Sequence, residues 1–353
     1  MITVTTTLRL SAALALLAVS GLPALAADIH VLNWKGYGTD ETWAVEAFEK
    51  ATGNKVIHDY FNSEQEMLTK IRTNPGTYDV VLVNAAFTDQ ALAEKLLQPI
   101  DATKIPNAAG ISADMIKSPM IAKADGQYGI PWVWGVTAMA VSDKAFPTPP
   151  TSIKVLWDEA HKGRVTLRDD AVEAIQFGAL ASGQNINDIK DMDAVKAKLT
   201  SLLPQLRTFW SSENDFNQMI ASGQIDAGTY WSGSADRAKV KFKLPVSFVI
   251  PEEGCVGWLD TLAIPTGSKN VEAAQAFINY MIDPTFYVEW NTRVGAPVSA
   301  NAKAVAALPD TAFNRTVLGD AKTVARIQFQ QPVTDEQRKA YLALWQELKV
   351  AAK

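Results

Sequence analysis

Apolar residues along the chain form short continuous runs, separated by segments in which apolar residues recur at helical spacing. The first three runs cover residues 29–34, 55–60 and 79–83. Runs of this length and content are typical of strands in a sheet. Two strand–helix–strand units in series predict a parallel sheet covered by helices, which is an α/β fold.

The helices of these units carry signals at their ends. Thr39 or Asp40 is expected to cap the first helix, Gly53 to stop it, and Ser63 to begin a Ser-x-x-Glu capping box ahead of the second. The same alternation continues to the C-terminus. Further strands are expected at residues 136–141, 164–167, 226–230, 246–250 and 261–265, and further helices at residues 170–181, 234–241, 271–282, 284–294 and 334–350.

The chain of 353 residues is too long to fold around one small hydrophobic core, so its length predicts two domains. No low-complexity linker separates two halves, so the chain is expected to cross between the domains several times. Candidate crossings lie at residues 130–135 and 254–260, where glycine and tryptophan precede a strand. Two ordinary transitions from loop to strand explain the same pattern equally well.

An apolar run at the N-terminus predicts export from the cytoplasm. Residues 8–26 end in Ala24-Leu25-Ala26, the small-x-small pattern that a signal peptidase cleaves. Gly21 and Pro23 interrupt the run, which favours a removable leader, residues 1–27, over a membrane anchor. No Cys stands at the cleavage point to accept a lipid, so the mature protein is expected to be released into the periplasm.

Composition and charge exclude several functions. With 33 Lys and Arg against 38 Asp and Glu, the net charge is −5 and no basic cluster appears, so nucleic acid is not an expected partner. The single Cys255 and the 3 scattered His residues offer no disulfide within the chain and no metal site. Without a nucleophile elbow, a P-loop or a dinucleotide fingerprint, we expect neither an enzyme nor a cofactor.

Tryptophan and acidic residues supply the remaining candidate chemistry. The chain has 10 Trp, and Trp34, Trp231 and Trp258 stand near glycines or acids. A Trp in a cleft can hold a cation against its ring face, although the core is the commoner place for any single Trp. Asp170 and Glu173 fall on one face of a helix start, where they could bind one ammonium group or simply cap the helix.

Several segments together carry a resemblance to a known family. They are Asn33-Trp34 with Tyr37, Tyr78–Val81, Tyr128–Gly135, Asp169–Glu173, Trp231–Ala235 and Trp258–Pro265. In this order and spacing they resemble the periplasmic spermidine/putrescine-binding proteins of ABC importers, along the whole mature chain.

The resemblance implies a two-lobed periplasmic-binding-protein-like fold of type II. Each lobe is then a β-sheet flanked by helices, with hinge strands between the lobes. Lobe 1 is expected at residues 28–135 and 259–304, and lobe 2 at residues 136–258 and 305–353.

The resemblance also assigns aromatic binding residues. Trp34 and Tyr37 match aromatic residues on the wall of the first lobe. Trp231 and Trp258 match tryptophans that sandwich the alkyl chain of the ligand in that family. We therefore expect these four side chains to line the cleft between the lobes.

Polar residues are assigned in the same way. Asp170 and Glu173 resemble the pair that holds a terminal ammonium, and Asp260 resembles the carboxylate that faces an inner amine. Gln330 resembles a late polar contact. Ser234 stands where putrescine-preferring members have an acid, which favours a longer amine.

Three positions depart from the family pattern. Lys35 follows Trp34 where a small polar residue is usual, and its ammonium would repel a polyamine, pair with an anionic part of another ligand, or lean into solvent. Asn84 begins a loop, Asn-Ala-Ala-Phe, where the family carries Ser and Tyr, and Ala296 replaces a common pocket Tyr. The pocket is therefore expected to be roomier at one end.

The expected function is capture of a polyamine or related amine by lobe closure, followed by delivery to an inner-membrane ABC permease, performed by a monomer. An alternative that Lys35 motivates keeps the receptor role for a ligand with both an amine and a carboxylate, such as an opine or an amino-acid conjugate. A more distant alternative is a secreted hydrolase that uses Asp170 and Glu173 as an acid–base pair.

Overall fold

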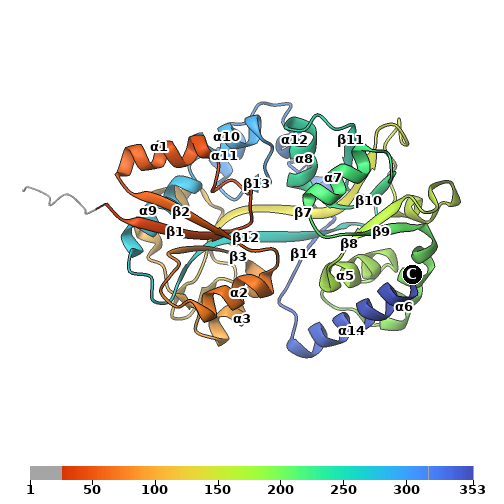
Figure 1. Cartoon of the computed structure of the whole chain (residues 1–353), viewed down its shortest axis with the longest axis horizontal. Coiled ribbons are helices and arrows are strands. Elements are labelled where there is room, and N and C mark those ends of the chain that lie inside the picture. The colour runs from red at the N-terminus through yellow and green to blue at the C-terminus, as the bar shows by residue number, and fades with distance from the viewer. Residues whose placement is uncertain (1–25, 317, 353) are drawn as a thin grey trace, which may run out of the picture.

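The computed structural model describes residues 26–316 and 318–352, and the expected leader lies outside them up to residue 25. It is an elongated α/β structure in which one main sheet extends through both halves (Figure 1). The strands are β1 (Asp28–Asn33), β2 (Lys55–Tyr60), β3 (Val80–Asn84), β4 (Leu97–Gln98), β5 (Ala122–Lys123), β6 (Gly126–Gln127), β7 (Ile130–Ser142), β8 (Val165–Arg168), β9 (Leu206–Trp210), β10 (Ala227–Trp231), β11 (Val246–Val249), β12 (Cys255–Pro265), β13 (Val298–Ser299) and β14 (Ile327–Phe329). The helices are α1 (Thr42–Thr52), α2 (Glu64–Thr73), α3 (Thr88–Ala93), α4 (Ala113–Ile116), α5 (Ala171–Ala181), α6 (Met192–Leu202), α7 (Glu213–Ala221), α8 (Ser232–Val240), α9 (Val271–Met281), α10 (Pro284–Arg293), α11 (Ala302–Ala306), α12 (Phe313–Thr316), α13 (Ala321–Val324) and α14 (Asp335–Ala351).

The main sheet has parallel outer parts and an antiparallel centre. Its neighbours are, in order, β2, β1, β3, β12, β7, β10, β8 and β9. The predicted parallel pairing is confirmed for β1 with β2 and β3, and the same arrangement recurs for β8 with β9 and β10. The joins of β12 with β3, β12 with β7 and β7 with β10 are antiparallel, which the sequence pattern did not predict.

The two central strands, β7 and β12, run side by side through the middle of the molecule (Figure 1). They contain 13 and 11 residues, and Gly135 pairs with Trp258 in their antiparallel register. The sequence predicted shorter strands, at residues 136–141 and 261–265. Both strands are longer because the glycine- and tryptophan-containing segments hydrogen-bond to each other, and a local pattern does not reveal a partner so far away in the chain.

The helix ends agree with the sequence in part. Gly53 ends α1 in a left-handed conformation at φ 78°, and Ser63 caps α2 by accepting a hydrogen bond from the backbone of Glu66. The expected cap of α1 is wrong. The Thr39 hydroxyl instead accepts a hydrogen bond from Asn33, and the Asp40 carboxylate accepts one from the backbone of Gly36.

Two large hydrophobic clusters lie at opposite ends of the central strand β7. The first cluster contains Leu32, Phe48, Phe277, Trp290 and Leu308, and the second contains Leu167, Ile175, Leu199 and Trp345. Each cluster combines segments that are distant in the sequence, so each half of the molecule has its own core. The exact lobe boundaries stay a prediction. Over the described ranges, no helix combines the length and hydropathy that crossing a bilayer would require.

Candidate functional site

Acidic and aromatic side chains gather where the parallel strands of both halves end. β1 and β3 of the first half end at Asn33 and Asn84, and β8 and β10 of the second half end at Arg168 and Trp231. The carboxyl ends of parallel strands are where open α/β sheets bind ligands, because loops and helix starts converge there.

Asp260 lies at the centre of the first group. It is opposite Asn84 in the pairing of β12 with β3, and it is 7% exposed. The Tyr37 hydroxyl donates to one carboxylate oxygen at 2.9 Å, and the Asn84 side chain donates to the other at 3.1 Å. Burial raises the pKa of Asp260 to about 7, although these two donors and the positive charge of Arg168 oppose that rise.

Glu64, the first residue of α2, is a member of this group that the sequence analysis missed. Its Oε2 atom is buried and has no hydrogen-bond partner within the described part of the chain. Burial raises the pKa of Glu64 to about 8, with further increases from the charges of Asp260 and Asp170 and a decrease from Arg168. The sequence analysis did not select Glu64 as a site residue because an acid in the first turn of a helix is already explained by the helix dipole.

The predicted acidic pair of the second half, Asp170 and Glu173, lies next to a cation of the protein itself, Arg168. A guanidinium nitrogen of Arg168 donates to Glu173 at 3.0 Å and lies 3.9 Å from Asp170. Asp170 is also the N-cap of α5, because its side chain accepts a hydrogen bond from the backbone of Glu173. The pair therefore both binds a cation and caps the helix, as the two interpretations of the sequence had it. The cation is Arg168, which neither interpretation included.

Arg168 also covers one of the predicted tryptophans. Its guanidinium carbon lies 4.6 Å from the centroid of the Trp231 ring, a distance typical of a cation–π contact. Burial disfavours the charged form of Arg168, but the neighbouring charges of Glu173 and Asp170 outweigh that effect and raise its pKa. Arg168 thus contacts Glu173, which the resemblance assigned to a ligand ammonium, and Trp231, which it assigned to the alkyl chain of the ligand.

The other predicted tryptophans occupy different positions. The Trp258 ring lies against Gly135, so closely that an added Cβ at Gly135 would be 2.5 Å from the ring. Trp258 Nε1 is buried without a hydrogen-bond partner among the described residues. Trp34 packs against Phe61 with 4.6 Å between ring centroids. Gly135 is needed here because any side chain would displace the Trp258 ring.

Three predicted residues make other contacts. Lys35 is exposed, and its ammonium lies 5.8 Å from the centroid of the Tyr60 ring. The Ser234 hydroxyl donates to Glu213 at 2.7 Å, in a network with Arg237. The Gln330 side chain donates to Gln176 at 2.6 Å. Lys35 therefore does not supply the positive charge near Asp260, which comes from Arg168.

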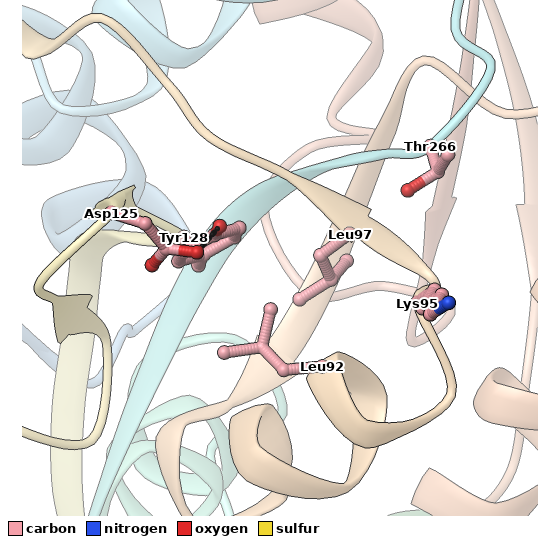
Figure 2. Close-up of a pocket in the computed structure, with 6 residues that line it drawn as sticks. All are labelled: Leu92, Lys95, Leu97, Asp125, Tyr128 and Thr266. Atoms are coloured by element: carbon pink, nitrogen blue, oxygen red, sulfur yellow. Dashed lines mark hydrogen bonds between the residues drawn. The ribbon is translucent and has the colours of Figure 1, made fainter.

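A separate pocket of about 290 Å³ lies outside this group of residues. Figure 2 shows Asp125 and Tyr128 on one side of it and Lys95 on the other. It contains none of the predicted site residues. Throughout residues 26–316 and 318–352, no group of His, Cys, Asp and Glu side chains is arranged to hold a metal ion.

The arrangement is suited to binding a cation. Asp260 and Glu64 from the first half and Asp170 and Glu173 from the second half bring four carboxyl groups to one region. Arg168 contacts Glu173 and lies close to Asp170, and the charge of Arg338 also acts on Asp170. An ammonium group brought into this region would form charge-assisted hydrogen bonds in a setting with little water, where such bonds are strong.

Comparisons with known proteins test the family resemblance. The model of the family described as bacterial extracellular solute-binding protein matches residues 43–315. The spermidine/putrescine-binding periplasmic protein of Escherichia coli (strain K12) is 32% identical over 321 residues, which cover 89% of this chain and 90% of that protein. The resemblance seen in the sequence is therefore confirmed.

Solved structures show the same fold. The spermidine/putrescine ABC transporter substrate-binding protein PotD from Streptococcus pneumoniae has a TM-score of 0.80 and 24% identity, over 93% of this chain and 100% of that one. The TpPotD lipoprotein of Treponema pallidum has a TM-score of 0.78 and 22% identity, over 92% of this chain and 99% of that one. The expected fold class, that of periplasmic binding proteins, is confirmed.

Proposed function

The chain belongs to the family of bacterial extracellular solute-binding proteins, and on this premise we propose that it is the periplasmic receptor of an ABC importer for an amine ligand. The receptor captures the ligand between its two halves, performs no chemistry on it, and presents it to an inner-membrane permease. It acts as a monomer, exported by the leader at residues 1–27. The relative from Escherichia coli is named for spermidine and putrescine, which makes linear amines the first ligands to test.

The observation that carries this proposal is the buried carboxyl pair Asp260 and Glu64. Among the described residues, the side chains that donate to Asp260 are the neutral Tyr37 and Asn84, and Glu64 Oε2 has no hydrogen-bond partner. Burial without a full countercharge raises the pKa of both groups. A ligand ammonium would supply that countercharge and would bind to both groups in their ionised form.

The alternative ligand, with both an amine and a carboxylate, has less support. It was motivated by Lys35, which is exposed and lies against Tyr60. The cation of the site, Arg168, is already paired with Glu173 and close to Asp170. A ligand carboxylate near Arg168 would therefore meet two carboxylates of the protein as well as the guanidinium.

The experiment is titration calorimetry on mature protein that has been freed of bound small molecules by unfolding and refolding. Putrescine, spermidine and 4-aminobutanoate are the probes, and 4-aminobutanoate replaces one ammonium end of putrescine by a carboxylate. We expect at least one of the two amines to bind and to raise the unfolding temperature. Tighter binding of 4-aminobutanoate would favour the alternative ligand, and no binding of any probe would overturn the proposed amine receptor.

A further inference from the structure

We propose that Arg168 acts as a built-in cation at the Asp170–Glu173 end of the site, so that the receptor selects short amines and discriminates against long linear polyamines. This inference rests on the proposed function, because it concerns which amines fit the same site. It assigns to Arg168 the role of a specificity-determining residue.

The first observation is geometric. The Arg168 guanidinium donates to Glu173 at 3.0 Å, lies 3.9 Å from Asp170, and stacks on Trp231 at 4.6 Å. A carboxylate pair beside an aromatic face is the arrangement that would bind the end of an alkylammonium chain. Here one side chain of the protein lies against both carboxylates and the ring face, and it leaves Glu173 Oε1 without a hydrogen-bond partner among the described residues.

The second observation is that Arg168 is firmly placed. It is the last residue of β8, its backbone N–H donates to the Thr229 hydroxyl, and its side chain is 19% exposed. Glu173 is also held by the Thr137 hydroxyl at 3.3 Å and by the Trp231 ring nitrogen at 3.4 Å. A ligand ammonium could replace Arg168 only by removing a largely buried cation from its ion pair, which is costly.

The third observation concerns the charges that remain. Glu173 is countered by Arg168 at its Oε2 atom, whereas no Lys or Arg in the described part of the chain forms an ion pair with Asp260 or Glu64. The carboxyl groups that a ligand ammonium can reach without displacing a cation of the protein are therefore those at the Asp260–Glu64 end. A ligand whose ammonium groups all lie near that end fits this distribution, whereas a third ammonium farther along a chain would meet the guanidinium of Arg168.

The ligand class that follows is a short amine with one or two ammonium groups and no carboxylate. Arg168 does not create a site for an anion, because Glu173 and Asp170 already surround it. This inference opposes the preference for a longer amine that Ser234 indicated, and the hydrogen bond of Ser234 to Glu213 accounts for that residue independently of a ligand.

The test compares the Kd values of putrescine, spermidine and spermine for the full mature protein by titration calorimetry. Wild-type protein is expected to bind putrescine at least about tenfold more tightly than spermidine or spermine. A further ammonium group of the longer amines would lie beside Arg168, where it cannot make the charge-assisted hydrogen bond that it makes to water. Arg168→Ser is expected to raise the affinity for spermidine relative to putrescine by at least about tenfold. Arg168→Lys keeps the positive charge and should not produce this gain.

Two further variants serve as controls. Arg207→Ser changes an exposed arginine on β9 and should leave every Kd unchanged. The double variant Arg168→Ser/Glu173→Gln removes both partners of the ion pair, so it should fold without the gain in spermidine affinity. If Arg168→Ser fails to fold, the wild-type preference still decides, because equal or tighter binding of spermidine overturns the inference.

The outcomes separate this inference from the proposed function. If no amine binds to folded wild-type protein or to folded Arg168→Ser, the proposed function is wrong. If amines bind but wild-type protein does not favour putrescine, or if Arg168→Ser does not shift the ratio, only the role of Arg168 is wrong.

Discussion

The hydroxyl of Tyr37 donates a 2.9 Å hydrogen bond to the carboxylate of Asp260, although 223 residues separate them in the sequence. The Asn84 side chain holds the other carboxylate oxygen at 3.1 Å. Two neutral donors fix the position of this carboxylate without neutralising its charge. Asp260 is thereby oriented for a cation, and the predictions below begin from this group.

Asp260→Asn is expected to weaken amine binding by at least about tenfold, because it removes the charge from a buried hydrogen bond. The ligand-free protein should not lose stability in proportion, since a buried amide escapes the desolvation cost of a buried carboxylate. Calorimetry gives the Kd, and thermal unfolding gives the stability. Asp114→Asn, exposed in α4, is the matched control, and an unchanged Kd in Asp260→Asn would contradict the assignment.

The stability of the ligand-free protein is expected to fall as the pH rises from about 4 to about 8. The folded-state pKa values of Asp260, about 7, and Glu64, about 8, lie above the ordinary values of 3.8 and 4.5. In this range the folded state therefore keeps protons that the unfolded state has released, and the free energy of unfolding decreases with pH. Tyr37 and Asn84 face Asp260, and the charges of Arg168 and Asp170 act on Glu64.

Amine affinity should change in the opposite direction over the same range. A cation binds the ionised carboxyl groups, so affinity rises with pH through about 7 to 8 and binding at pH 7 releases protons. Titrations in buffers of different ionisation enthalpy measure that release. The double variant Glu64→Gln/Asp260→Asn should remove most of the pH dependence of stability, and an unaltered profile in it would mean that other groups are responsible.

Asp169 and Asp170 are adjacent in the sequence but are expected to respond differently to the same substitution. Asp169 accepts hydrogen bonds from Trp345 and Lys349 of α14, so Asp169→Asn should lower the unfolding temperature with little effect on Kd. Asp170→Asn keeps a good N-cap for α5 and removes one charge of the site, so its main effect should be on amine affinity. Each variant is the control for the other, and equal effects on affinity would refute this division.

Gly135→Ala is expected to reduce affinity by displacing Trp258. The added Cβ would lie 2.5 Å from the Trp258 ring and 2.7 Å from the Ser232 hydroxyl, both shorter than contact distances. Trp fluorescence and calorimetry measure the displacement and its cost. In the double variant Gly135→Ala/Trp258→Phe, the smaller ring should relieve part of the clash, so the stability losses should not add. Strict additivity would count against a direct contact.

Arg338→Ala is expected to weaken amine binding by about two- to fivefold through an indirect effect on closure. The Arg338 guanidinium of α14 lies 5.0 Å from the centroid of the Phe87 ring, which follows β3 in the other half. Such a contact contributes about 0.5–1 kcal/mol, and it stabilises the arrangement in which the halves meet. Lys339→Ala, at an exposed neighbouring position, should have no effect on Kd. An affinity loss of similar size in Lys339→Ala would argue against a specific role of the contact between Arg338 and Phe87.

Local patterns in the sequence determined part of the secondary structure, although they did not predict α6, α7 or β9. The helix that ends at Gly53, the Ser63 cap of α2 and the Asp170 cap of α5 all depend on residues close together in the chain, and all three are present in the structure. The family resemblance also depended on order and spacing alone. The lengths of β7 and β12 depended on each other, so no local pattern could give them.

The sequence by itself determined which residue types this protein offers to a ligand, namely carboxylates and tryptophans at strand ends. Only the tertiary structure decided how their charges are balanced. It brought Glu64 of the first half within electrostatic reach of Arg168 and Asp170 of the second half, and it placed Arg168 between Glu173 and Trp231. Charge interactions act through space and strengthen with burial, and neither quantity can be read along a chain.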